Sequence, residues 1–169
     1  MTSAVCLGGH WKRIDKAIAA MQEVTGPVEV RKAVRQQIAA GADWIKVYAD
    51  YRRGPGREAT PTFSQEELDA LVDEAHSAGL PVVAHATVDE AITRAVKAGV
   101  ATIEHGYDAS LEVLTMMRKR GVVLCPTLAA SEAMARYGGW TPEQKDDSRI
   151  SKIWKSFERA LQSGVTIAC

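Results

Sequence analysis

The sequence predicts a parallel α/β fold of the barrel type, in which short buried strands alternate with longer amphipathic helices. Apolar strand-like runs recur along the chain, most of them are continuous rather than alternating, and glycines end the helical stretches between them. Continuous apolar runs are typical of strands that are buried on both faces of a parallel sheet. Repeated strand–helix units with short connections imply right-handed crossovers, and hence parallel strands.

The predicted strands are the short runs rich in valine and isoleucine. They cover residues 4–7, 44–48, 81–85, 101–105, 122–126 and 165–169. Three consecutive runs end at His85, His105 and Pro126, 20 and 21 residues apart, which suits a compact strand–helix unit. The two long connections, 49–62 and 129–147, are predicted to be loops. Loops at strand ends bind substrate in barrel enzymes, but ordinary solvated connections explain the same composition.

The helices carry boundary signals. Ser64 is a predicted N-cap, Glu67 completes a capping box with it, and Gly79 ends the helix that follows. Thr87 is predicted to open the next helix in the same way, and Gly99 to close it. Two further helices are expected, one lined by Val30, Val34 and Ile38 and ending at Gly41, and one from Ser110 to Gly121.

Composition limits the class of protein. The 169 residues suffice for one domain, which we take as 1–169. Lys plus Arg and Asp plus Glu number 21 each, so no net field favours nucleic acid or a membrane surface as a partner. No apolar run approaches the ~20 residues that span a bilayer, and no export signal is visible. The three cysteines are widely spaced, which is typical of reduced thiols in a cytoplasmic protein.

Three chemically capable side chains end three of the predicted strands: Lys46 in WIKVY, His85 in PVVAHA and His105 in ATIEHG. Consecutive strand ends meet at one mouth of a parallel barrel, so we expect them to converge. A buried lysine shifts towards the neutral amine, which forms Schiff bases, acts as a base or adds CO2 to give a carbamate. A carbamate bridges two cations, and two imidazoles complete a ligand set that suits zinc. Each residue alone is more often structural, and only the combination predicts a metal site.

Three further residues are candidates for substrate contacts. Tyr48 and Tyr107 each lie two residues beyond a predicted ligand, which turns them towards the barrel mouth. His10 follows two glycines that would let the backbone approach a ligand closely. Packing at the barrel rim explains both tyrosines slightly better than substrate binding does. Glu104 is expected to face the helical layer and to make a structural hydrogen bond there.

The segments GADWIKVYA, GLPVVAHAT and GVATIEHGYD resemble the amidohydrolase superfamily, in particular imidazolonepropionase-like proteins and prolidase-like dipeptidases. The resemblance implies a distorted (β/α)8 TIM barrel of the metal-dependent hydrolase type. In that family the fourth strand carries a carboxylated lysine that bridges two metals, and the fifth and sixth strands end in histidine ligands. Lys46, His85 and His105 resemble these three ligands in order, and residues 8–11 resemble the loop after the third strand.

Two further ligand motifs of the family are not found in the sequence. Nothing upstream of His10 supplies the His-x-His pair of the first strand, and the eighth-strand candidate reaches Cys169 without an aspartate. The resemblance therefore implies an incomplete barrel, approximately the third to eighth strands. It also implies metal-dependent hydrolysis of carbon–nitrogen bonds, with a dipeptide or Xaa-Pro substrate. Hydrolysis by this chain alone is expected to be absent or near background.

Two alternatives stay open. Lys46 is also suited to be the Schiff-base nucleophile of a barrel aldolase, although that chemistry gives the two histidines no role. The second alternative is an inactive incomplete barrel that self-assembles into a homo-oligomer. Missing strands would leave unpaired sheet edges and an apolar interior, and both favour association.

Overall fold

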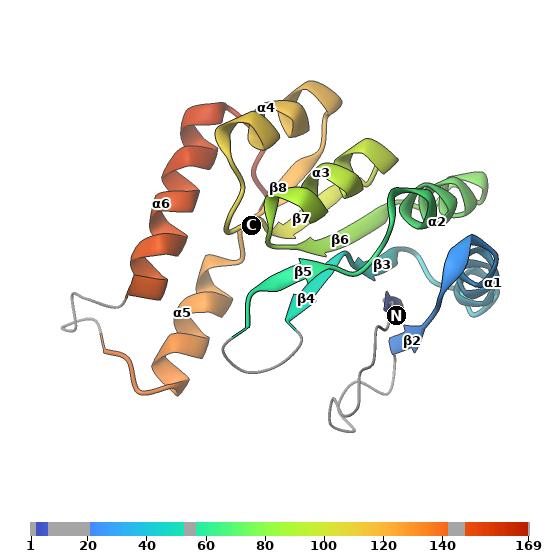
Figure 1. Ribbon diagram of the computed structural model, residues 1–169, viewed down its shortest axis with the longest axis horizontal. Coiled ribbons are helices and arrows are strands. Elements are labelled where there is room, and N and C mark those ends of the chain that lie inside the picture. The colour runs from blue at the N-terminus through green and yellow to red at the C-terminus, as the bar shows by residue number, and fades with distance from the viewer. Residues whose placement is uncertain (1–2, 7–20, 53–56, 142–147, 169) are drawn as a thin grey trace.

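The computed structural model describes residues 3–6, 21–52, 57–141 and 148–168, and its centre is a six-stranded parallel sheet (Figure 1). The strand order in the sheet is β2-β1-β3-β6-β7-β8. These strands are β1 (Ser3–Cys6), β2 (Met21–Glu23), β3 (Ile45–Tyr48), β6 (Val82–Ala86), β7 (Thr102–His105) and β8 (Val123–Cys125). The predicted α/β class with a parallel sheet is confirmed. Strand β2 was not predicted, because its three residues MQE lack an apolar run.

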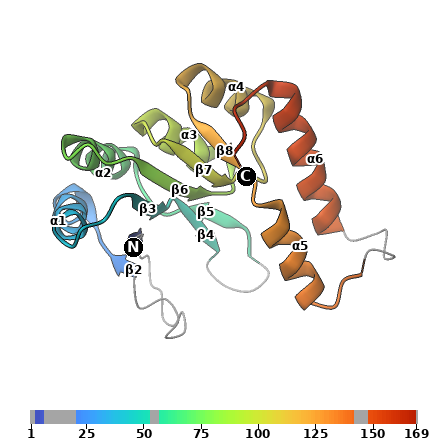
Figure 2. The same cartoon turned by 180° about the vertical axis from the view of Figure 1, so that it is seen from behind.

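Helices α1 to α4 lie along one face of the sheet, and α6 packs against α4 and α5 at the β8 end (Figure 1). The view from behind also places α1 and α6 at opposite ends of the molecule (Figure 2). The helices are α1 (Gly26–Ala39), α2 (Gln65–Ser77), α3 (Asp89–Ala98), α4 (Leu111–Arg120), α5 (Leu128–Tyr137) and α6 (Ser148–Ser163). None of the described helices is long and apolar enough to cross a membrane.

The sheet has two unlike faces. Ile45, Val47, Ala84 and Ile103 are fully buried and belong to the core between sheet and helices. The residues between them in the strands are half-buried and point to the other side, as the alternation of a strand requires. That second face would line the interior of a complete barrel. Charged and aromatic residues, among them Lys46 and Tyr48, share this face with the apolar Val83 and Val123.

A single carboxylate, that of Glu67, organises the start of two helices. It accepts a hydrogen bond from the backbone N–H of Ser64 at 2.8 Å, and Ser64 Oγ accepts one from the N–H of Glu67 at 3.2 Å. This is the predicted capping box of α2, now confirmed. The second oxygen of Glu67 accepts from the N–H of Gly26, the first residue of α1, at 2.8 Å. The N-termini of α1 and α2 are therefore fastened to each other.

Both long connections contain more regular structure than predicted. The first holds an antiparallel hairpin of β4 (Asp50–Arg52) and β5 (Ala59–Pro61). The prediction of a loop over 129–147 is wrong for its first part, where α5 ends only at Tyr137. The sequence LAASEAMARY is rich in good helix formers, so propensity favours this helix. The described part of the last predicted strand, residues 165–168, makes only an isolated parallel bridge to β8, between Ile167 and Leu124.

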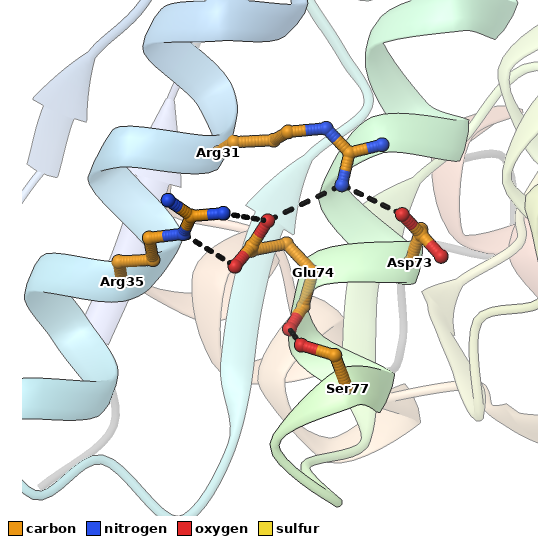
Figure 3. Close-up of polar contacts among 5 residues, drawn as sticks. All are labelled: Arg31, Arg35, Asp73, Glu74 and Ser77. Carbon is orange, nitrogen blue, oxygen red and sulfur yellow. Dashed lines mark hydrogen bonds and ion pairs between the residues drawn. The ribbon is translucent and has the colours of Figure 1, made fainter.

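An ion-pair cluster joins α1 to α2 (Figure 3). Arg35 Nε and Arg31 Nη1 of α1 lie 2.6 and 3.2 Å from the carboxylate of Glu74 on α2. Arg31 also contacts Asp73 at 2.6 Å. The Glu74 side chain is only 10% exposed, so its charge depends on these partners. The hydrogen bond from Arg35, followed by that from Arg31, lowers the pKa of Glu74.

We expect Glu74→Gln to lower the free energy of unfolding near neutral pH, because it removes the charge that both guanidinium groups contact. The pKa of Glu74 is lower in the folded state than in the unfolded chain. Its stabilisation is therefore complete above the unfolded pKa and is lost as the pH falls through the folded pKa. Urea unfolding from about pH 7 to about pH 3 should show the variant and the original protein converging in acid. The exposed Glu58→Gln is the control, and a difference that does not change with pH contradicts the expectation.

Candidate metal centre at the strand ends

The structure places Lys46, His85 and His105 on three adjacent parallel strands. The two histidines lie near the carboxyl ends of β6 and β7, whereas Lys46 is the second residue of β3 and lies opposite Val83. In the register of β3, β6 and β7, Tyr48 lies opposite His85, and His85 lies opposite Glu104. Lys46 precedes Tyr48 by two residues and so shares its side of the sheet. The rings of His85 and His105 lie edge to face, with their centroids 4.6 Å apart. The three predicted ligands therefore lie on neighbouring strands, on the face that the helices leave open.

Burial disfavours the charged forms of two of these groups. It lowers the pKa of Lys46, against the opposing charges of Glu104 and Cys125. Burial, the neighbouring His85 and the charge of Lys46 lower the pKa of His105 to about 4. His105 is therefore a neutral imidazole near pH 7, the form that binds cations. The lowered pKa shifts the amine of Lys46 towards its neutral form, which reacts with CO2 to give a carbamate or with a carbonyl group to give a Schiff base.

The backbone turns sharply at His105. Its φ is +77°, and the N–H of Gly106 donates to the carbonyl of Glu104 at 3.2 Å. This is a γ-turn of the rare form with positive φ at its central residue. Gly106 has a φ of +61°, and a Cβ on it would lie 2.6 Å from Leu124 Cδ1, so any other residue there would be strained and would have to displace that side chain. Strand alternation alone would aim His105 at the helices with its partner Ala86, and the turn redirects the imidazole to the open face.

The same turn explains why the expectation for Glu104 is wrong. Glu104 was expected to face the helices because its neighbour His105 was placed at the barrel mouth. In the structure Glu104 follows the regular alternation and shares the open face with Lys46 and His85. Its charge acts on Lys46, and its Oε1 accepts a hydrogen bond from Thr102 at 3.4 Å. Two successive residues thus face the site, which a strict two-residue period cannot predict.

Asp50 is a site residue that the sequence analysis missed. It opens the hairpin directly after β3 and is fully buried. Its carboxylate accepts from the N–H of Thr87 at 2.5 Å and of Val88 at 2.8 Å, and from the Thr87 hydroxyl at 3.1 Å. It also lies 3.4 Å from Nε2 of His85. A carboxylate two residues past a predicted strand end was the available signal, but it lay within a segment expected to be a solvated loop.

The contact with Asp50 corrects the predicted start of α3. Thr87 was expected to be the N-cap, but Val88 occupies that position and no side chain of the helix itself caps it. The buried carboxylate of Asp50 satisfies the free amides instead, as an anion at a helix N-terminus does. Because His85 lies two residues before Thr87, the same carboxylate fixes the end of β6 next to the imidazole.

The three candidates for substrate contacts differ in what surrounds them. The ring of Tyr48 lies against His85, with centroids 4.9 Å apart. The hydroxyl of Tyr107 is hydrogen bonded to Thr127 Oγ1 at 2.9 Å and to Ser131 Oγ, and lies 3.2 Å from Nδ1 of His105. His10 lies outside the described residues. Substrate binding by these residues stays a prediction.

The donor set is incomplete for a closed metal site. In the described part of the chain, no three His, Cys, Asp or Glu side chains are placed to hold one ion together. Two adjacent histidines and a lysine with a lowered pKa nevertheless offer donors of the right chemistry on one face. His76 is exposed on α2 and is not part of this group.

Comparison with known proteins identifies related sequences and structures. The model of the amidohydrolase family matches residues 5–169. Ochratoxinase of Aspergillus niger is 33% identical over 167 residues, which are 95% of this chain and 34% of that protein. Its crystal structure superposes with a TM-score of 0.77 at 32% identity, covering 88% of this chain and 35% of that one.

Two further crystal structures are similar. One is a Xaa-Pro dipeptidase with methionine bound in its active site (TM-score 0.73, 38% identity, 88% of this chain and 38% of that one). The other is a prolidase in complex with N-methylphosphonate-L-proline (TM-score 0.80, 31% identity, 99% of this chain and 46% of that one). The chain thus spans less than half of the length of each of these relatives.

We expect Asp50→Asn to lower the free energy of unfolding by about 1–3 kcal/mol, because an amide NH2 replaces a buried oxygen that accepts from backbone N–H groups. Urea unfolding at neutral pH measures the change. The matched control is Asp69→Asn, an exposed aspartate on α2, with an expected change within about 0.5 kcal/mol. Equal effects of the two substitutions would contradict the role of Asp50 in holding α3.

Proposed function

The chain belongs to the amidohydrolase family, and on this premise we propose that Lys46, His85 and His105 bind divalent metal for the hydrolysis of amide bonds. The observation that carries the proposal is their placement on one face of three adjacent parallel strands, with both histidines near the carboxyl ends of their strands. Active sites of parallel barrels lie at this end of the strands. The described residues supply part of such a site. We assign the hydrolytic activity to a complete barrel that contains them.

The roles follow from the chemistry of each group. The neutral imidazole of His105 and its neighbour His85 are nitrogen donors that suit zinc. Lys46, with its lowered pKa, is the residue we assign to carbamate formation, since a neutral amine reacts with CO2. When bound, a pair of metal ions supplies a reactive water at neutral pH and polarises the scissile carbonyl. Asp50 and the turn at His105 hold the two imidazoles in place.

A dipeptide, in particular of the Xaa-Pro type, is the substrate class we propose. The support comes from the similar structures of a Xaa-Pro dipeptidase and a prolidase. Tyr48, against His85, is placed to contact a bound substrate, and His10 and Tyr107 are the other two candidates. The aldolase alternative uses Lys46 alone and leaves two adjacent imidazoles without a role. A cytoplasmic location and a homo-oligomer stay predictions.

Metal binding is expected to need both histidines. We expect His85→Asn and His105→Asn each to weaken zinc binding by more than about tenfold, because each removes a nitrogen donor. Calorimetric titration of the metal-free chain with zinc measures the affinity. His76→Asn is the matched control, since it removes an exposed histidine far from the strand ends. The same affinity in all three variants would rule out this pair as ligands.

Carbamate formation is expected at Lys46. The chain incubated with zinc and 13C-bicarbonate should show a carbamate carbon signal by NMR, because the pKa of this amine is lowered. We expect the signal to disappear in Lys46→Arg, whose guanidinium stays charged. Lys97→Arg on α3 should leave it unchanged. A signal that survives Lys46→Arg would assign the carbamate to another lysine.

The substrate class is tested in a chimera of residues 3–168 of this chain with the remaining strands of the similar Xaa-Pro dipeptidase. We expect the chimera with zinc to hydrolyse Xaa-Pro dipeptides, to lose this activity with His105→Asn and to keep it with His76→Asn. The chain alone should stay near background. A chimera that folds and binds zinc but cleaves no Xaa-Pro dipeptide would exclude the proposed substrate.

A further inference from the structure

Two residues of the described chain other than glycine have positive φ, and they are hydrogen bonded to each other. They are His105 (+77°) and Thr127 (+50°), and His105 Nδ1 lies 2.6 Å from Thr127 Oγ1. His105 ends β7 and Thr127 follows β8, the neighbouring strand. A left-handed conformation is unfavourable for a β-branched residue such as threonine. Strain of this kind persists where the surroundings enforce it, and it clusters at functional sites.

The side chain of Thr127 does not make the capping hydrogen bond that its position predicts. Thr127 is the N-cap residue of α5, where threonine normally accepts a hydrogen bond from the first turn of the helix. In this structure its side chain makes no such bond. Its hydroxyl lies between His105 Nδ1 and the hydroxyl of Tyr107, at 2.6 and 2.9 Å. A capping interaction is therefore replaced by a contact with a predicted metal ligand.

Three hydroxyl groups continue from His105 in one direction, those of Thr127, Tyr107 and Ser131, which we call the hydroxyl chain. Thr127 Oγ1 contacts Tyr107 Oη, and Tyr107 Oη contacts Ser131 Oγ. Ser131 Oγ then donates to the backbone carbonyl of Thr127 at 3.3 Å. Ser131 is only 5% exposed, so the far end of the hydroxyl chain is screened from water.

The carbonyl of Thr127 at the far end favours one direction for the bonds of the hydroxyl chain. It accepts from Ser131 twice, from the backbone N–H at 3.2 Å and from Oγ at 3.3 Å. A carbonyl only accepts, so Ser131 is the donor in the second contact and its Oγ is left to accept from Tyr107. Tyr107 then accepts from Thr127, and Thr127 Oγ1 accepts from His105. In this direction the proton of the neutral imidazole lies on Nδ1 and Nε2 keeps its lone pair, whereas the reverse direction would place the proton on Nε2.

We propose that Thr127, Tyr107 and Ser131 are positioning residues that hold His105 as the Nδ1–H tautomer and leave Nε2 free to bind a cation. The binding of the cation rests on the proposed function, whereas the tautomer does not. Partners of this kind around a metal-binding histidine fix its ring and its tautomer in other metal sites. Tyr107 thereby has a role that needs no substrate, and the first turn of α5 becomes part of the site.

The tautomer is measured in the metal-free chain at about pH 7.5, where His105 is neutral. Long-range 1H–15N correlation spectra of the chain labelled with 15N-histidine distinguish the two tautomers. A solvated imidazole prefers the Nε2–H form, and the exposed His76 serves as this reference in the same spectrum. We expect His105 to show the Nδ1–H pattern. An Nε2–H pattern at His105 in the original chain overturns the proposal.

Variants separate positioning from simple packing. Ser131→Ala is the most informative variant. Ser131 does not contact the imidazole, but its hydroxyl sets the direction of the hydrogen bonds in the hydroxyl chain. We expect Ser131→Ala, Thr127→Val and Tyr107→Phe to shift His105 towards the Nε2–H form, and Thr127→Ser to keep Nδ1–H. Thr115→Val, which removes a hydroxyl bonded within α4, is the control. An unchanged tautomer in Ser131→Ala, Thr127→Val and Tyr107→Phe contradicts the proposal.

The variant Thr127→Gly tests whether a change of tautomer arises only from loss of folding. Glycine relieves the positive φ, so thermal unfolding should show equal or greater stability while the Nδ1–H tautomer is lost. A loss of stability together with an unchanged tautomer would mean that Thr127 serves only the backbone, and would overturn the proposal.

Zinc titration of Thr127→Val separates this inference from the proposed function. We expect about 10–100-fold weaker binding than in the original chain. If His105 is held as Nδ1–H but the original chain binds no zinc, the hydroxyl chain stands and the proposed metal function fails. If zinc binds at His85 and His105 while His105 is Nε2–H in the metal-free chain, the function stands and the hydroxyl chain is refuted.

Discussion

The in-register parallel pairing of β3, β6 and β7 is the constraint on which the candidate site depends. It places Tyr48, His85 and Glu104 side by side, with Lys46 on the same face. The backbone hydrogen bonds of a parallel sheet fix this register, and the burial of the other face against helices keeps it from slipping. A shift of one residue would turn the site residues into the core and the core residues into the open face.

Carboxylates reinforce this frame where helices begin. Glu67 joins the starts of α1 and α2, Asp50 holds the start of α3, and Asp89 accepts from the N–H of Ser110 at the start of α4 at 2.7 Å. In each case an oxygen satisfies amide groups that have no partner within their helix. The stability of the layer and the geometry of the strand ends are thus linked, most directly at Asp50, which contacts both α3 and His85.

The backbone is strained at the candidate metal centre, at His105 and Thr127. The γ-turn at His105 and the left-handed Thr127 both oppose what their residue types prefer. Glycine at position 106 allows the first, since a Cβ there would collide with Leu124. The imidazole is held between a strained turn and a hydroxyl from the next strand, which gives it one orientation on a face that would otherwise leave it free.

The sequence by itself determined the parallel α/β class, most strand positions and the placement of Lys46, His85 and His105 on neighbouring strands, because apolar runs, capping signals and strand ends are local features. The site partners were decided only by the tertiary structure. Asp50 replaces Thr87 at the start of α3 because a hairpin carries it there. Glu104 shares the open face because the turn at His105 breaks the two-residue period. Thr127 reaches His105 from the end of the neighbouring strand, and contacts between residues distant in sequence leave no periodic signal in either segment.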